Sequence, residues 1–319
     1  MKGARARAWL AGVSAAIVFW SASASGAEAF ITDQTGDEVS VLDLGSKQVV
    51  ARIPVLGKPA GIAMARDGRT AYVTSTEGKY VSVIDTASRN IVSKIAIPDT
   101  PLGIAADPAG GFIYVAGFYQ PRLYKIDLAT ATIAASVQVG ASPSGVAITP
   151  DGALIVTAAR RQSSLDHRRE NFCPQRHGQG RRASVRCDYR CAGGARVYRE
   201  CRKQRRIIVD LAGGTLLGTV AVDKRPYAVA LAKGRGFSTD QYGGTVSVFD
   251  LATLQPVKRI SVGDYPDGIE TSADGNSVYV VNWFSNEVWA IDAETLAVTA
   301  KMPAGDGPRA FGTFLREMP

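Results

Sequence analysis

The chain has 319 residues, a formal net charge of +8, 46% hydrophobic and 21% charged residues, four Cys and two His. This length suits one large domain or two ordinary ones, and the composition is that of a globular protein rather than a disordered one. No apolar run reaches the ~20 residues of a membrane-spanning helix, which excludes a polytopic membrane protein. The 33 glycines follow no collagen period and suggest many turns.

The N-terminus has the three-part layout of a secretory signal peptide. A cationic start is followed by an apolar run at 8–20 and by small residues up to Ala27. We therefore expect residues 1–27 to be a signal peptide and the mature chain to begin at Glu28, in the periplasm or outside the cell. The alternative is an uncleaved membrane anchor.

An internal repeat of about 42 residues organises the remainder, 28–319. An alternating apolar segment that ends in Asp recurs at spacings of 42, 42, 83, 40 and 42 residues, and a proline recurs with the same spacings. The interval of 83 corresponds to two periods with one copy missing. The anchors are Asp43, Asp85, Asp127, Asp210, Asp250 and Asp292, with Pro59, Pro101, Pro143, Pro226, Pro266 and Pro308.

Each repeat reads as four short strands, which the unit that starts at Pro59 illustrates. Its apolar alternation predicts strands over 59–64, 71–74, 81–85 and 90–97, with a turn at Asp67-Gly68. A four-stranded sheet of this size cannot bury both faces alone, whereas sheets stacked radially can. The sequence therefore predicts an all-β fold, a seven-bladed β-propeller of four-stranded antiparallel blades. The last segment, from Pro308, is expected to complete the first blade and close the ring.

Several of these segments resemble the YVTN-type β-propeller repeat proteins. The similarity rests on Tyr72-Val73-Thr74, on the Val81–Asp85 strand, on the strand opening at Pro143 and on Pro150-Asp-Gly152. It covers about 28–160 and 207–319. The motifs are structural, so the resemblance implies a propeller fold and says little about activity. A WD40 propeller is not favoured because the Gly-His and Trp-Asp pairing of that family is absent.

Residues 161–206 do not follow the repeat. They contain both His, all four Cys and fourteen basic against four acidic residues, a net charge of +10, so the rest of the chain carries −2. The interval from Asp127 to Asp210 nevertheless has the length of two ordinary periods, which an inserted domain would have changed. We interpret the segment as a blade that two compensating frameshifts have degraded, and we expect it to be poorly ordered. Ordered strands with a full apolar inner face over 161–206 would contradict this interpretation, and resequencing the gene across 155–210 would test the reading frame.

Functional interpretations of the same segment stay open. Cys173 with His177, or Cys187 with Cys191, could ligate a metal, although their spacing fits no structural zinc pattern. The arginine pairs could contact nucleic-acid phosphates. Four Cys in an exported chain could form disulfides.

Outside this segment the chain has no His and no Cys. That composition excludes a Ser-His-Asp triad, a Cys nucleophile, His-ligated metal and c-type haem attachment, so we expect no metal and no cofactor. The repeated aspartates are predicted to form turns rather than a catalytic site, because they recur in every blade.

Candidate binding residues lie where the loops of neighbouring blades meet over the central channel. There, aromatic and charged side chains differ from blade to blade and could bind a ring-bearing or anionic ligand. An equally open alternative is that the aromatic side chains merely cover blade edges. The candidates are Lys58, Phe118, Tyr119, Arg225, Tyr227, Tyr242, Tyr265, Asp267, Trp283, Phe284 and Arg309.

The function that fits best is a non-catalytic periplasmic binding or scaffold protein, a monomer whose partner is a small molecule or a periplasmic protein. One alternative is a lactonase-like hydrolase, by analogy of architecture, with an acid site such as Asp267 and Glu77. Two others are an accessory protein of a periplasmic redox system and nucleic-acid binding by the aromatic and basic rim.

Overall fold

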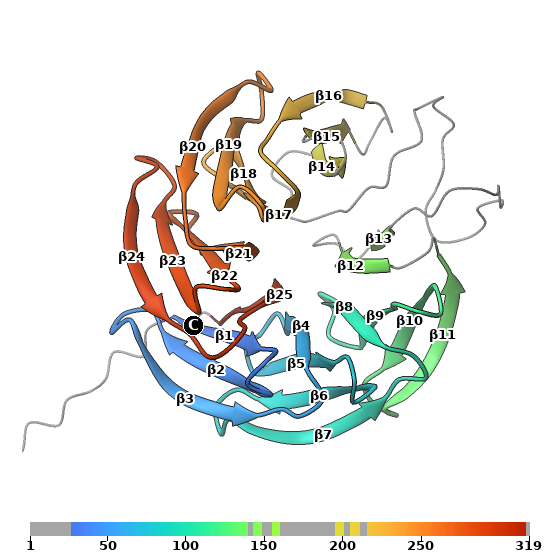
Figure 1. The fold of residues 1–319 in the computed structure, drawn as a ribbon. Helices are drawn as coiled ribbons and strands as arrows, with labels where there is room; N and C mark the ends of the chain where they lie inside the picture. The colour runs from blue at the N-terminus through green and yellow to red at the C-terminus, as the bar shows by residue number, and fades with distance from the viewer. Residues whose placement is uncertain are drawn as a thin grey trace, which may run out of the picture.

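A computed structural model describes residues 27–139, 143–148, 155–159, 195–200, 205–210 and 216–316. These residues form strands and turns without a helix, so nothing in this part of the chain is a helix that could span a membrane. The strands fall into seven sheets, which are arranged radially around a common centre (Figure 1). The predicted all-β propeller is therefore confirmed, and the seven sheets are consistent with seven blades.

Five of the sheets have at least four strands. The first contains β26 (Leu315–Arg316), β1 (Glu28–Asp33), β2 (Glu38–Asp43) and β3 (Gln48–Pro54). The second contains β25 (Phe311–Thr313), β4 (Pro59–Met64), β5 (Thr70–Ser75), β6 (Tyr80–Asp85) and β7 (Asn90–Ala96). The third contains β8 (Pro101–Ala106), β9 (Phe112–Gly117), β10 (Arg122–Asp127) and β11 (Thr132–Gln138).

The next two sheets are shorter within the described residues. One pairs β12 (Pro143–Ile148) with β13 (Ile155–Ala159), and the other contains β14 (Ala195–Glu200), β15 (Arg205–Asp210) and β16 (Leu216–Ala221). The ring continues with β17 (Pro226–Ala232), β18 (Arg235–Asp240), β19 (Thr245–Asp250) and β20 (Pro256–Ser261). The remaining sheet contains β21 (Pro266–Thr271), β22 (Ser277–Asn282), β23 (Glu287–Asp292) and β24 (Val298–Pro303).

The segment 161–206 is only partly described. Of it, the backbone of β14 and the start of β15 pair antiparallel and continue to β16. The cysteines and histidines that the sequence analysis singled out lie outside the described residues.

Five innermost strands, β4, β8, β12, β17 and β21, begin at the repeated proline, which has no N–H to leave unpaired at the start of a ladder. Innermost strands of successive sheets contact one another, as β4 does β8 and β17 does β21. This approach is close at two glycines: a Cβ on Gly61 would collide with the Leu102 carbonyl, and one on Gly268 with the Ala310 carbonyl. Glycine at these positions lets the inner strands pack against their neighbours.

The core lies between the faces of neighbouring sheets. One cluster joins Phe30 and Val41 of the first sheet to Ile62 of the second and to Val281 of the last. All four side chains are fully buried. Each sheet thus covers the apolar face of the next, which supplies the burial that a single blade lacks.

The repeated aspartates close the turns that follow the third strand of a blade. Asp250 Oδ1 accepts the backbone N–H groups of Ala252 and Thr253, and Asp292 accepts the corresponding pair from Glu294 and Thr295. Hydrogen bonds from the backbone and from the Thr hydroxyl lower the pKa of both carboxyls. Asp127 accepts the same pair, and Asp43 and Asp85 each accept the N–H of the residue three positions on. The Asp210 side chain lies outside the described residues.

The C-terminal segment that closes the ring pairs with β1 of the first sheet at both of its ends and leaves that sheet in between. Pro308 bridges Asp33, and Leu315 pairs with Ala29. Between these two pairs the C-terminal segment has six residues, 309–314, whereas β1 has three, 30–32. The three surplus residues cannot stay in the ladder. They leave it as β25, which pairs parallel with β4 of the next sheet and lies at the centre of the ring (Figure 1). Gly312 has a φ of 136°, a backbone conformation that residues with a side chain rarely adopt.

Candidate functional site

Two of the predicted site residues, Arg225 and Tyr265, stand immediately before the proline of an inner strand in a strained conformation, and Lys58, with φ 60°, does the same on another blade. Arg225 has φ 54° and Tyr265 has φ 57°, both in the left-handed region. Gly307 occupies the same position before Pro308 with φ 68°. A non-glycine residue costs about 1 kcal/mol in this conformation. Their side chains are thus presented at the channel mouth at the expense of backbone stability.

These two residues meet aromatic side chains from the turns that join β18 to β19 and β22 to β23. The Tyr265 ring lies 5.7 Å from that of Tyr242, 5.4 Å from that of Trp283 and 4.9 Å from that of Phe284, between ring centroids. Tyr242 is 62% exposed and Phe284 is 65% exposed. We call Arg225, Tyr242, Tyr265, Trp283 and Phe284 the aromatic rim.

Arg225 is held in place by the rings around it. Its Nη1 donates to the Tyr265 hydroxyl at 2.7 Å and also to the Tyr242 hydroxyl. Its guanidinium carbon lies 4.6 Å from the Tyr242 ring centroid. Burial raises the pKa of Tyr265, which keeps its hydroxyl protonated at neutral pH. The result is a fixed cation beside exposed aromatic surface.

A second group lies deeper and joins three sheets. Arg309 donates from Nε to Asp267 Oδ2 at 2.7 Å, from Nη1 to Gln34 at 3.2 Å and from Nη2 to the Tyr227 hydroxyl at 3.2 Å. Gln241 donates to the other Asp267 oxygen at 2.8 Å. The Asp267 side chain is fully buried and that of Arg309 is 13% exposed. We call Arg309, Asp267, Tyr227, Gln34 and Gln241 the ring clasp.

The ring clasp supports the aromatic rim from below. The Arg309 guanidinium carbon lies 4.0 Å from the Trp283 ring centroid. Burial alone would lower the pKa of Arg309, but the ion pair with Asp267 and the bond to Tyr227 raise it above its ordinary value. Arg309 therefore stays charged, and its charge is paired with that of Asp267 inside the protein.

The two acidic residues considered for a hydrolase site, Asp267 and Glu77, are both engaged in contacts within the protein. Asp267 is ion-paired with Arg309 and accepts a hydrogen bond from Gln241. Glu77 lies in the turn between β5 and β6, where its backbone N–H donates to the Gly57 carbonyl. Among the described residues, no three His, Cys, Asp or Glu side chains are grouped to hold a metal ion.

The remaining three candidates lie apart from both groups. Phe118 and Tyr119 form their own edge-to-face pair, 5.2 Å between centroids, in the turn after β9. Lys58 is paired with Asp37, with 3.2 Å between Nζ and Oδ2. The structure thus brings together eight of the eleven predicted side chains and leaves these three on other blades.

Sequence reasoning missed Gln34 and Gln241. Gln34 directly follows β1, which ends at Asp33, and Gln241 directly follows β18, which ends at Asp240. Trp283 has the same position after β22. A comparison of that single position across the repeats would have found them.

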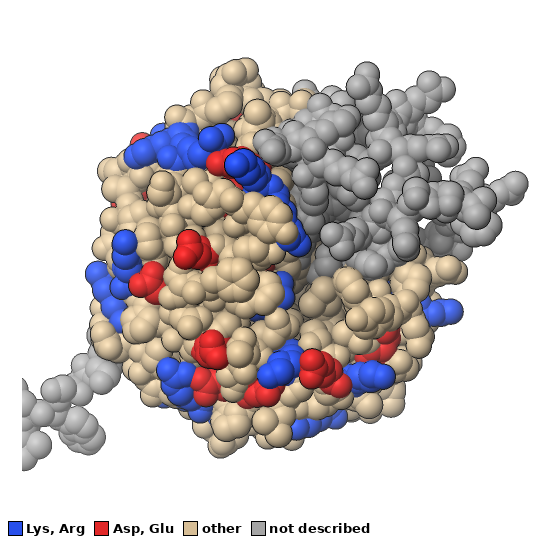
Figure 2. Space-filling model, in the orientation of Figure 1, with Lys and Arg blue, Asp and Glu red and all other residues tan. Residues whose placement is uncertain are grey.

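The visible face of the molecule carries charges of both signs. Basic and acidic side chains are interspersed over it, with a band of basic ones above β17 and β18 (Figure 2). The described residues of this face therefore do not form the single continuous basic field that is typical of a nucleic-acid surface.

Comparisons with known proteins agree with the fold. The family described as YNCE-like beta-propeller matches residues 5–109. Kuenenia stuttgartiensis hydrazine synthase is similar in structure, with a TM-score of 0.68 and 21% identity over 81% of this chain and 90% of that one. Dihydro-heme d1 dehydrogenase NirN, in complex with DHE, has a TM-score of 0.65 and 14% identity over 89% of this chain and 74% of that one. No curated protein matches the chain.

At these identities the structural likeness concerns the fold alone. The family match covers the first repeats, and the same 42-residue period continues through the later ones. The matched family model, the repeat and the radial sheets together show a β-propeller fold, whose first repeats are similar to the YNCE-like beta-propeller family.

Proposed function

We propose that this propeller is a non-catalytic binding protein and that its aromatic rim captures a flat, ring-bearing ligand with a negative charge. The observation that carries the proposal is Arg225, a cation fixed by the Tyr242 and Tyr265 hydroxyls beside exposed rings. A flat ring can stack on Tyr242 or Phe284 while its acidic group reaches the guanidinium.

The backbone supports the same function. A glycine before each inner proline would be less strained, as Gly307 illustrates, yet Arg225 and Tyr265 of the rim occupy two of these positions, and Lys58, paired with Asp37, occupies a third. Strained residues that project functional side chains are a recurrent feature of ligand sites.

The first test uses 2-naphthalenesulfonate as a flat anionic probe and 2-naphthalenemethanol as its uncharged counterpart, both measured by titration calorimetry. Arg225→Gln is expected to weaken sulfonate binding about tenfold and to leave the alcohol nearly unchanged, because only the sulfonate uses the charge. Phe284→Ser should weaken both probes, because both use the stacking surface.

Tyr119→Ser is the matched control, since Tyr119 is 76% exposed and lies on another blade. It should bind both probes like the unmodified protein. The proposal is wrong if neither probe saturates, or if Tyr119→Ser loses as much affinity as Phe284→Ser.

A role beside a periplasmic redox system is the second candidate, and the structural likeness to two proteins named for hydrazine and haem d1 chemistry favours it. A tetrapyrrole with carboxylate groups combines the ring and the charge that the rim would recognise. Hemin in the same titration distinguishes this candidate: a saturable change in its absorption that Arg225→Gln weakens would support it. Short single-stranded DNA serves as the probe for the nucleic-acid alternative.

We further propose that the protein is exported and that the mature chain begins at Glu28. The propeller starts at this residue: Glu28 is held by Arg316 at 2.7 Å and by Arg89 at 2.8 Å. The intact mass of protein recovered from a periplasmic extract should correspond to residues 28–319. Recovery of the uncleaved chain in the membrane fraction would contradict the proposal.

A further inference from the structure

The centre of the ring holds a cavity of about 320 Å³ that is separate from the aromatic rim. Its walls are the inner strands β4, β8, β12, β17 and β21 together with β25. The cavity is lined by residues that follow the rim-facing residues of the inner strands. In β21, for example, Asp267 belongs to the ring clasp, whereas Gly268 to Thr271 line the cavity. The cavity thus lies farther along the channel, away from the rim.

The ring clasp lies across the rim side of this cavity. Tyr227, which accepts a bond from Arg309, packs edge-to-face on Phe311 with 5.3 Å between centroids, and Phe311 lines the cavity. At the other end Arg66 is exposed and also lines the cavity. A ligand therefore enters from the side of Arg66, opposite to the aromatic rim.

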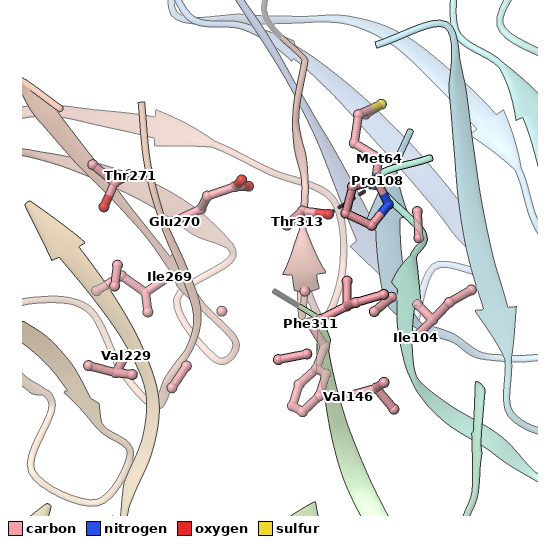
Figure 3. Close-up of a pocket in the computed structure, with 18 of the residues that line it drawn as sticks. Met64, Ile104, Pro108, Val146, Val229, Ile269, Glu270, Thr271, Phe311 and Thr313 are labelled. Atoms are coloured by element: carbon pink, nitrogen blue, oxygen red, sulfur yellow. Dashed lines mark hydrogen bonds between the residues drawn. The ribbon is translucent and has the colours of Figure 1, made fainter. Parts of the chain in front are cut away.

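The cavity is divided into an apolar half and a polar half (Figure 3). Val146, Val229 and Phe311 lie in one half, and Glu270 and Thr313 lie in the other, beside Met64 and Pro108 (Figure 3). An apolar cavity of about 150 Å³ holds benzene, so this one has room for about twelve non-hydrogen atoms. That size is at the lower end of small-molecule sites.

The charged groups of the polar half do not favour an ion. Glu270 Oε2 accepts the N–H groups of Phe314 at 2.6 Å and Leu315 at 2.8 Å, and Asp107 Oδ1 accepts that of Ala109 at 3.1 Å. Arg66 supplies the opposite charge at the mouth. Two carboxylates already bound to backbone and one guanidinium produce neither a strong anion site nor a strong cation site.

Thr313, an exposed residue of the wall, supplies an uncharged hydrogen-bond donor. Thr313 Oγ1 accepts the Met64 N–H at 3.0 Å, and among the described residues its own O–H has no acceptor. The Thr313 side chain lies between Glu270 and Pro108 (Figure 3). A ligand with a carbonyl oxygen could accept this O–H and place its hydrocarbon part against Val146 and Val229.

We propose that the channel is a second binding site, for an uncharged and largely apolar molecule of about twelve non-hydrogen atoms with one hydrogen-bond acceptor, such as a ketone or an ester. The site rests on the cavity and on Thr313, and it does not depend on the function proposed for the aromatic rim. Failure of one therefore leaves the other untouched.

The test compares three probes of equal size by titration calorimetry: 2-undecanone, decanoate and undecylamine. The ketone is expected to bind most tightly. Thr313→Val should weaken ketone binding about tenfold, because it removes the donor and keeps the shape. Thr299→Val, a change on the outer strand β24, is the matched control and should leave ketone binding unchanged.

Val146→Phe fills part of the apolar half and should abolish ketone binding, whereas Phe284→Ser on the aromatic rim should not affect it. Should Val146→Phe fail to fold, Val146→Leu provides a milder filling with a smaller loss. Tighter binding of decanoate or undecylamine, no binding of any probe, or unchanged affinity in both Thr313→Val and the filled variant would overturn the proposal.

Discussion

Replacement of Arg309 by methionine is expected to lower the free energy of unfolding by about 3–5 kcal/mol, because it leaves the fully buried Asp267 as an unpaired charge. The same change removes the bonds to Gln34 and Tyr227, which connect the C-terminal segment to other sheets. Equilibrium urea unfolding measures the loss. The double variant Arg309→Met with Asp267→Asn should recover most of it, since no charge then remains buried.

Arg52→Met provides the comparison. Arg52 pairs with Glu38, but half of its side chain is exposed, so water already screens the pair. Its loss should cost less than about 1 kcal/mol. If Arg309→Met cost no more than Arg52→Met, or if the double variant were as unstable as the single one, the ring clasp would not hold the propeller closed.

The second large effect concerns Asp33, which is fully buried beside the ring closure. Burial raises the pKa of Asp33 to about 7, although the bond from Ser40 opposes the change. Among the described residues, its Oδ1 has no hydrogen-bond partner. The segment 305–309 lies directly over Asp33, because the backbone N–H of Gln34 donates to the Gly307 carbonyl and that of Arg309 donates to the Thr32 carbonyl.

The sign follows from proton binding. The folded protein holds the Asp33 proton up to about pH 7, whereas an unfolded chain releases it near pH 4. Folding is therefore favoured at low pH by this group, and the stabilisation is lost as the pH rises towards 7. Between pH 5 and pH 8 the free energy of unfolding should fall by about 2–3 kcal/mol through Asp33 alone.

Asp33→Asn should remove this pH dependence and stabilise the protein at pH 8, because the amide can be buried without ionising. Urea unfolding of both proteins at pH 5, 6, 7 and 8 measures the difference. Asp240 occupies the equivalent place in another blade, where its carboxylate accepts the hydroxyls of Ser238, Thr245 and Ser247. Asp240→Asn should therefore give no stabilisation at pH 8, and equal pH profiles for Asp33→Asn and the unmodified protein would refute the assignment.

A large part of the fold could be predicted because the blades share local rules. The period of 42 residues, the alternation within strands and the turn after each aspartate depend on residues close in sequence. The predicted strands around Pro59 agree with β4 to β7 to within a residue or so at each end. The candidates for the site could also be named, because loops of a propeller differ where ligands bind.

The strands, the turns and the positions in each repeat from which the rim side chains project follow from the 42-residue pattern alone. The packing of the blades was needed to show that Arg225, Tyr265 and Trp283 meet while Phe118 lies elsewhere, and that Arg309 is buried against Asp267. It alone showed that β25 leaves its own blade to line a cavity. The physical reason is that a repeat specifies equivalent places in every blade, whereas contacts between blades depend on ring closure, which brings together residues as far apart as Gln34 and Arg309.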